Sequence, residues 1–210
     1  MVASKANSVS VSGEPNRGMI EDILKGYSSR ITNPLLPEFI KQFYAHFSRE
    51  ECIDAPDDTW FAIANSALTF ASFRKKNEAK IRVYNPDKEH HGWESPYTVV
   101  EMVNTDMPFL VDSVTAELNR QGFKIYQILH PVIHSLRNEN GELLEILPDK
   151  SQAKDSVIHE SFIHFQVTGT MNQAALEALE AGLFYVLKNV SHAVEDWKPM
   201  LQAIEQLSHQ

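Results

Sequence analysis

Histidine is the residue type with the widest chemical range in this chain, and nine histidines make a metal or acid–base site worth testing. His159, Glu160 and His164 approach the spacing of the zinc-binding helix motif. That motif needs histidines four apart on one helix face, whereas these are five apart in a segment whose pattern predicts a strand. His130 and His134 could share a strand face, but two ligands do not make a site. We therefore expect no metal site.

The sequence also lacks the spacing of nucleotide-binding motifs and of a catalytic serine motif. Glycines stand at positions 13, 18, 26, 92, 122, 141, 169 and 182, so neither G-x-G-x-x-G nor a P-loop is present. No G-x-S-x-G elbow occurs, and His159 and Glu160 point to opposite faces of a strand, so they cannot easily act on one substrate. The single cysteine, Cys52, fits a reducing compartment and receives no role. We expect no catalytic residue and no cofactor in this chain.

Charge and hydropathy exclude two further classes of partner. The chain has 19 Lys and Arg against 28 Asp and Glu, a net charge of −9, and its longest basic run is 74–76. This pattern gives no phosphate-binding footprint, so nucleic acid is not an expected partner. No apolar stretch approaches the roughly 20 residues needed to cross a bilayer, and residues 1–18 lack a signal-peptide core. We expect a cytoplasmic protein without membrane contact.

The elements that would position any site fall into two parts. Residues 1–16 are Ser-rich and predict a disordered tail, and residues 17–86 predict a helical lobe. Apolar stripes at helical spacing lie at 19–27, 39–47 and 60–73, and the third helix should start at Pro56 and Asp57. A short strand at 80–86 ends the lobe. The polar stretch 87–95 predicts a surface loop and the boundary between the two parts.

The second part, residues 96–208, begins with a strand at 98–103 that leads into a helix. Asn104 and Asp106 can cap that helix, Pro108 suits its first turn, and Gly122 should end it in a left-handed conformation. A single strand at 125–136, a turn at 138–141 and a returning strand at 143–147 follow, and 148–156 is polar and loose. The pattern thus predicts strand, helix and hairpin in succession.

A strand at 157–168 and a long helix complete the chain. In the strand, Ile163, Phe165 and Val167 share the face that we expect to be the core. From Asn172 onward an apolar stripe predicts one long helix, with a kink or break at 191–198 because Pro199 lies within it. An alternative is that 190–194 forms a short closing strand.

The segment around Pro108 resembles the signature of ACT domains, small βαββαβ modules that sense amino acids. The residues that carry this resemblance are Asp106, Pro108, Phe109, Leu110, Val114, Leu118, Gly122 and Ile125. It implies an α+β fold, a ferredoxin-like antiparallel sheet with helices on one face. It also implies a ligand site at the turn formed by Asn104, Asp106, Met107, Pro108 and Phe109. The family usually has glycine where Phe109 stands, and a bulky side chain there obstructs close approach to the backbone.

A wider resemblance covers most of residues 40–200. The runs FYAHFS at 43–48, RVYNP at 82–86, VVEMVNTDMPFLVDSV at 99–114, HPV at 130–132 and AVEDW at 193–197 are similar to the N-terminal part of the large bacterial NAD-specific glutamate dehydrogenases. The resemblance implies that a full-length member oxidises L-glutamate to 2-oxoglutarate and ammonia with NAD. Members are several times longer than 210 residues, so no catalytic residue is carried over.

Three interpretations remain open at this stage. The first is a non-catalytic regulatory or assembly segment, whose partners are the remainder of the dehydrogenase chain and other subunits of a homo-oligomer. The second is a free-standing ACT-like sensor that binds an amino-acid effector at the turn, where a helix N-terminus favours a carboxylate. The third is an unrelated enzyme that uses a histidine and carboxylate pair such as His159 and Glu160. For the turn itself, the alternative to ligand binding is that Pro108 simply starts a helix.

Overall fold

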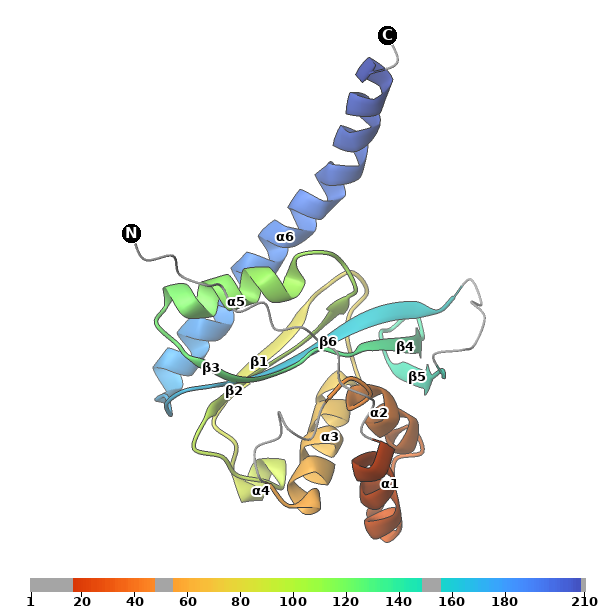
Figure 1. Ribbon diagram of the computed structural model, residues 1–210, viewed down its shortest axis with the longest axis vertical. Helices are drawn as coiled ribbons and strands as arrows, with labels where there is room; N and C mark the ends of the chain where they lie inside the picture. The colour runs from red at the N-terminus through yellow and green to blue at the C-terminus, as the bar shows by residue number, and fades with distance from the viewer. Residues whose placement is uncertain (1–16, 48–54, 149–155, 209–210) are drawn as a thin grey trace.

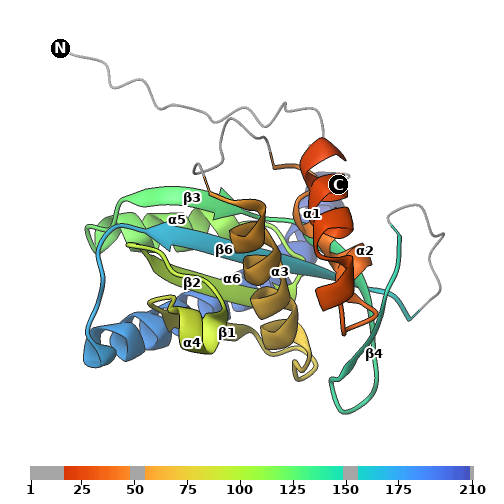
Figure 2. The same ribbon diagram turned by 90° about the horizontal axis from the view of Figure 1, so that it is seen from below.

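A computed structural model describes residues 17–47, 55–148 and 156–208, with side chains as far as residue 195. The predicted tail 1–16, most of the polar stretch 148–156 and Cys52 lie outside these residues. One antiparallel sheet lies between two layers of helices (Figures 1 and 2). The α+β class and the ACT-like arrangement predicted from the sequence are therefore confirmed.

The first helical layer consists of α1 (Arg17–Gly26), a 3-10 turn (Ser28–Arg30), α2 (Leu36–Phe43) and α3 (Asp57–Ala71). The start of α3 is where the acidic first turn predicted it. The second helix is shorter than its stripe suggested, because 44–46 form a turn, although Tyr44 and Phe47 stay buried. The stripe therefore predicted burial correctly and the helix end incorrectly.

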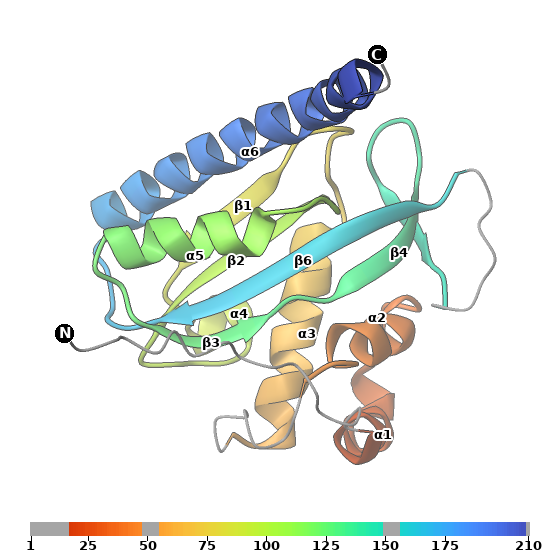
Figure 3. The ribbon, with the colours of Figure 1, turned by 45° about the horizontal axis from the view of Figure 1, so that its top comes forward.

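The sheet contains β1 (Lys80–Tyr84), β2 (Thr98–Thr105), β3 (Ile125–Leu129), β4 (Val132–Arg137), β5 (Leu143–Ile146) and β6 (Ile158–Val167). Its order is β1-β2-β6-β4-β5, with β3 also paired to β6. Strand β6 is central: one edge pairs with β2, and the other pairs with β4 at its start and β3 at its end. Figure 3 shows β6 crossing the whole sheet.

The single strand expected at 125–136 is two strands. The chain leaves the ladder at His130 and Pro131, because proline has no N–H to donate, and Phe162 N donates to the Pro131 carbonyl at 3.0 Å. The polar stretch 87–95 also contains a short helix, α4 (Lys88–His91), whose N-cap Asp87 accepts a hydrogen bond from His90 N. Hydrophobic periodicity cannot detect either the break at Pro131 or a helix as short as α4.

The second helical layer consists of α5 (Leu110–Arg120) and α6 (Gln173–Ser208), which cover the other face of the sheet (Figure 3). Helix α5 ends at Arg120, and Gly122 just beyond it has the left-handed φ of 85° that was predicted. Helix α6 is continuous for 36 residues, so the expected break does not occur and 190–194 is helical rather than a closing strand. Helix α6 thus continues through Pro199, even though a proline in a helix interior removes one backbone hydrogen bond.

Strand β1 pairs with β2, although β1 belongs to the part of the chain, residues 17–86, that precedes the predicted ACT-like part. Their register pairs Lys80 with Val103 and Tyr84 with Val99. On the outer edge of β1, the N–H of Val83 donates to Glu180 of α6 at 3.2 Å. A helix side chain thus covers part of an edge that would otherwise offer unpaired donors. The ranges 17–86 and 96–208 stay a prediction as domain limits.

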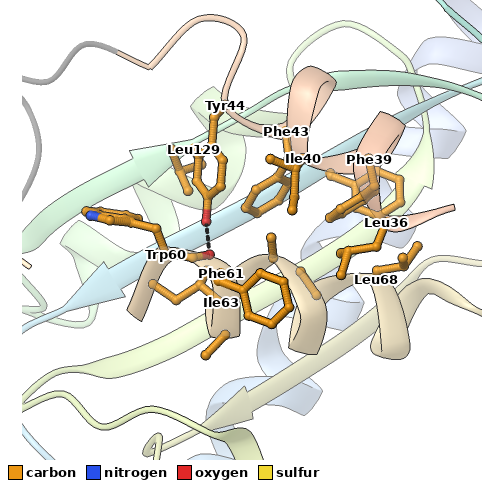
Figure 4. Packing of buried hydrophobic residues seen from close by; sticks show 14 of the residues in the cluster. Leu36, Phe39, Ile40, Phe43, Tyr44, Trp60, Phe61, Ile63, Leu68 and Leu129 are labelled. Atoms are coloured by element: carbon orange, nitrogen blue, oxygen red, sulfur yellow. Dashed lines mark hydrogen bonds between the residues drawn. The ribbon is translucent and has the colours of Figure 1, made fainter. Parts of the chain in front are cut away.

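Both faces of β6 are buried. Ile163, Phe165 and Val167 pack against α5 and α6, as expected of the core face. The opposite face, with Phe162, belongs to a second cluster formed with α1, α2 and α3. Figure 4 shows the aromatic part of that cluster, in which the Tyr44 hydroxyl donates to the Trp60 carbonyl at 2.7 Å (dashed line); the labelled residues are Leu36, Phe39, Ile40, Phe43, Tyr44, Trp60, Phe61, Ile63, Leu68 and Leu129. The sheet is therefore the middle layer of three.

Candidate functional site at the turn between β2 and α5

The turn 104–109 connects the end of β2 to α5, at one end of the sheet. The Asp106 N–H donates to the carbonyl of His159 on β6 at 2.8 Å, and Ser113 N donates to the Phe109 carbonyl at 3.0 Å. These two hydrogen bonds fasten the turn to the central strand on one side and to the helix on the other. The structure thus holds the predicted ligand-site residues in one fixed segment.

The start of α5 differs from the prediction. Phe109 is the N-cap residue, with φ 69° and ψ 3°, and no side chain makes a capping hydrogen bond. Asn104 is still within β2, and Asp106 contacts β6 instead. Phe109 therefore adopts the left-handed conformation that glycine enters at little cost, and this explains why glycine suits the position after Pro108.

A polar cluster lies beside the turn. Ser161, fully buried on β6, donates from Oγ to Asp106 Oδ1 at 2.5 Å. Its oxygen lies 3.2 Å from Nε2 of His130, so His130 donates through that nitrogen. Partial burial lowers the pKa of His130, although the negative charge of Asp106 opposes the shift. The cluster therefore holds a neutral histidine and a carboxylate on opposite sides of one hydroxyl.

Asn104 adds a buried donor to this end of the sheet. Its side chain is 4% exposed, and its Nδ2 has no hydrogen-bond partner among the described residues. Asn104 pairs in register with Ser161, and directly paired residues of an antiparallel ladder point to the same face. An unsatisfied buried donor costs about 1–3 kcal/mol, which a ligand acceptor could recover.

The cluster does not have the geometry of nucleophilic catalysis. In a Ser–His–Asp triad the histidine lies between the other two and takes the proton of the serine. Here Ser161 is the middle member, bonds directly to Asp106 and has no exposed surface. Within the described residues no three His, Cys, Asp or Glu side chains gather in a way that could hold a metal ion.

Two buried ion networks on the α3 face of the sheet were not predicted. Glu160 is ion-paired with Arg74, and with Arg137 at 2.9 Å. Glu101 accepts from His164 Nδ1 at 2.7 Å and is ion-paired with Arg82. Arg82, Glu101 and His164 are successive partners across β1, β2 and β6. The sequence does not show these networks, because they depend on which residues of neighbouring strands are paired.

Sheet, helices and turn together define an ACT-like α+β domain. The chain belongs to the glutamate dehydrogenase ACT1 domain family, whose family model matches residues 39–183. The predicted resemblance to the N-terminal portion of the large bacterial NAD-specific enzymes is thereby confirmed.

Relatives described as NAD-specific glutamate dehydrogenases are similar over most of the chain. The Pseudomonas aeruginosa protein is 38% identical over 167 residues, covering 80% of this chain and 10% of the relative. The Halomonas elongata protein is 35% identical over 187 residues, covering 85% and 12%. The Mycobacterium tuberculosis protein is 24% identical over 186 residues, covering 82% and 11%. The chain spans about a tenth of the length of these relatives, and no solved structure matches it.

Among the described residues, none of the helices combines the length and the apolar character needed to span a bilayer. The long helix α6 is the one whose length alone would suffice. Its first half carries its buried leucines on one face, towards the sheet, as an amphipathic helix does.

Proposed function

We propose that this chain is a non-catalytic segment of an NAD-dependent glutamate dehydrogenase and serves regulation or assembly. The observation that carries the proposal is the family match over residues 39–183, set against relatives about ten times longer. In the whole protein, L-glutamate, NAD and water would become 2-oxoglutarate, ammonia and NADH in another part of the chain. The remainder of that chain and other subunits of a homo-oligomer are the proposed partners, in the cytoplasm.

The turn 104–109 is the proposed effector site, and an α-amino acid is the proposed ligand. The N-terminus of α5 favours a carboxylate by about 0.3–1 kcal/mol at an exposed position. Asn104 offers a buried amide donor without a partner, and Asp106 offers a negative charge for an ammonium group. A zwitterion satisfies both, whereas a simple anion would be repelled by Asp106.

Two measurements test the proposal separately. Glutamate-dependent NAD reduction by the 210-residue chain alone should be absent, and clear turnover would contradict the non-catalytic role. Calorimetry with a panel of amino acids should give heat that Asn104→Ala weakens, with Asn119→Ala on the far end of α5 as the matched control. Absence of heat at millimolar ligand would contradict amino-acid binding at the turn. The assembly role would then be tested separately by sedimentation of the chain.

A further inference from the structure

A second site lies at the opposite end of β2, on the opposite face of the sheet from the turn. A cavity of about 200 Å³ opens between the start of α3, the segment 93–97 and the strands β3 and β6. Its lining includes Trp60, Trp93, Tyr97, Tyr126 and Gln166. Tyr97 precedes β2 and Asp106 follows it, so about 25 Å of strand separates the cavity from the turn.

The tryptophan walls of the cavity are fixed by packing, and its two tyrosines stack on each other at the surface. Trp60 and Trp93 are each 3% exposed, and Nε1 of Trp60 donates to the Ala55 carbonyl at 3.2 Å. Tyr97 and Tyr126 stack with ring centroids 4.4 Å apart and an interplanar angle of 22°. Partial burial and the neighbouring Tyr126 raise the pKa of Tyr97, which keeps the phenol neutral. The rings are therefore positioned before any ligand arrives.

Charge and size narrow the class of ligand. Among the described residues that line the cavity, Glu94 alone has a formal charge, and neither lysine nor arginine lines it. Glu94 is ion-paired with Lys88 at 2.8 Å, but both side chains are largely exposed, so this pair is weak. Drug-sized ligands occupy pockets of about 300–1,000 Å³. The cavity is smaller and suits a compact group rather than a nucleotide or an anion.

We propose that this cavity binds a small organic cation with a methylated ammonium group. Aromatic rings attract such a cation through their π-faces, and removing water from the site strengthens the attraction. Glu94 at the rim adds a carboxylate of the complementary sign, and the Ser95 hydroxyl, which donates to Gln166 at only 3.4 Å, offers a polar contact for a ligand hydroxyl. This inference is independent of the proposed amino-acid effector at the turn.

Choline is the probe, and 3,3-dimethylbutan-1-ol is its uncharged isostere. Two of the three tryptophans, Trp60 and Trp93, line the cavity, so tryptophan fluorescence of the 210-residue chain reports occupancy. We expect a saturable change with choline at constant ionic strength, and an affinity for the isostere lower by about five-fold or more. Equal affinity for both compounds, or no saturable change with choline, would overturn the proposal.

Variants of the two tyrosines test where choline binds, and they distinguish the contribution of the aromatic ring from that of the hydroxyl. Tyr97→Leu and Tyr126→Leu should each weaken choline binding about five-fold, whereas Tyr97→Phe and Tyr126→Phe should stay within about two-fold. Both tyrosines lie at the surface, and circular dichroism checks that each variant is folded. Equal loss in the Phe and Leu variants would contradict the cation–π assignment, as would unchanged affinity in both Leu variants.

Discussion

Glu101 accepts a hydrogen bond from Nδ1 of His164 at 2.7 Å, between directly paired positions of β2 and β6. Burial alone would raise the pKa of Glu101, but the His164 hydrogen bond and the positive charge of Arg82 outweigh it and lower the pKa. The two strands are thus joined by a buried ionised group as well as by their ladder. Breaking one partner of such a group leaves the others without compensation.

Glu101→Gln should lower the free energy of unfolding by about 3 kcal/mol at pH 7. The pKa of Glu101 is lower in the folded protein than in the unfolded chain, so its contribution is complete above the unfolded value of about 4.3. The contribution is lost as the pH falls through the folded pKa. Urea unfolding from pH 7 to pH 3 measures this, and the difference between wild type and variant should shrink towards acid. Glu139→Gln, at an exposed position of the turn 138–141, is the control and should show little difference at any pH.

Phe109→Gly should be more stable than Phe109→Ala by about 1 kcal/mol, because both variants remove the ring and only glycine relieves the positive φ. Urea unfolding of the two variants isolates the backbone cost from the packing of the ring. Equal stabilities would mean that the left-handed conformation at Phe109 carries no cost.

Gly141→Ala should destabilise the fold by at least about 3 kcal/mol, since it adds overpacking to an unfavourable φ. A Cβ at this position would lie 2.3 Å from the backbone oxygen of Arg74, and φ is 94°. Gly122→Ala is the matched control: φ is 85° and nothing lies within 4 Å of the added atom, so about 1 kcal/mol is expected. Thermal unfolding compares the two, and similar losses would show that the contact with Arg74 is readily relieved.

Asp106→Asn should lower the pKa of His130 further. Partial burial already lowers it, and the negative charge of Asp106 is the influence that raises it. Titration of the histidine ring protons by NMR measures the shift directly. Asp112→Asn, an exposed position in the first turn of α5, is the control and should leave the His130 titration in place. A rise in the pKa of His130 in Asp106→Asn would contradict the arrangement around Ser161.

Hydrophobic periodicity predicted the elements that one stripe or one alternation defines. The leucines of α6, the start of α3 at Asp57 and the left-handed end of α5 at Gly122 follow from local patterns. The failures are local as well. The strand predicted at 125–136 is split at Pro131, although its apolar pattern continues. The N-cap of α5 is Phe109, whereas Asn104 and Asp106 were expected to cap that helix.

The contacts that the sequence could not predict join residues of different strands and segments, whose pairing is not visible in a local pattern. Glu160 contacts Arg74 and Arg137 only because the distant segment after α3 and a neighbouring strand converge on it. Ser161 meets Asp106 for a similar reason: β6 and β2 are paired across a sequence separation of 55 residues. The turn was recognised from the segment around Pro108, whereas the residues beside it needed the register of the sheet.

The central position of β6 also determines when the chain can fold during synthesis. Before residues 158–167 emerge from the ribosome, β1 with β2 and β4 with β5 are two separate two-stranded pairs. Such pairs are marginally stable in water, and contacts between distant segments form slowly. A nascent chain that pauses before β6 therefore exposes both edges that β6 later occupies, and this is the interval in which a chaperone would be needed.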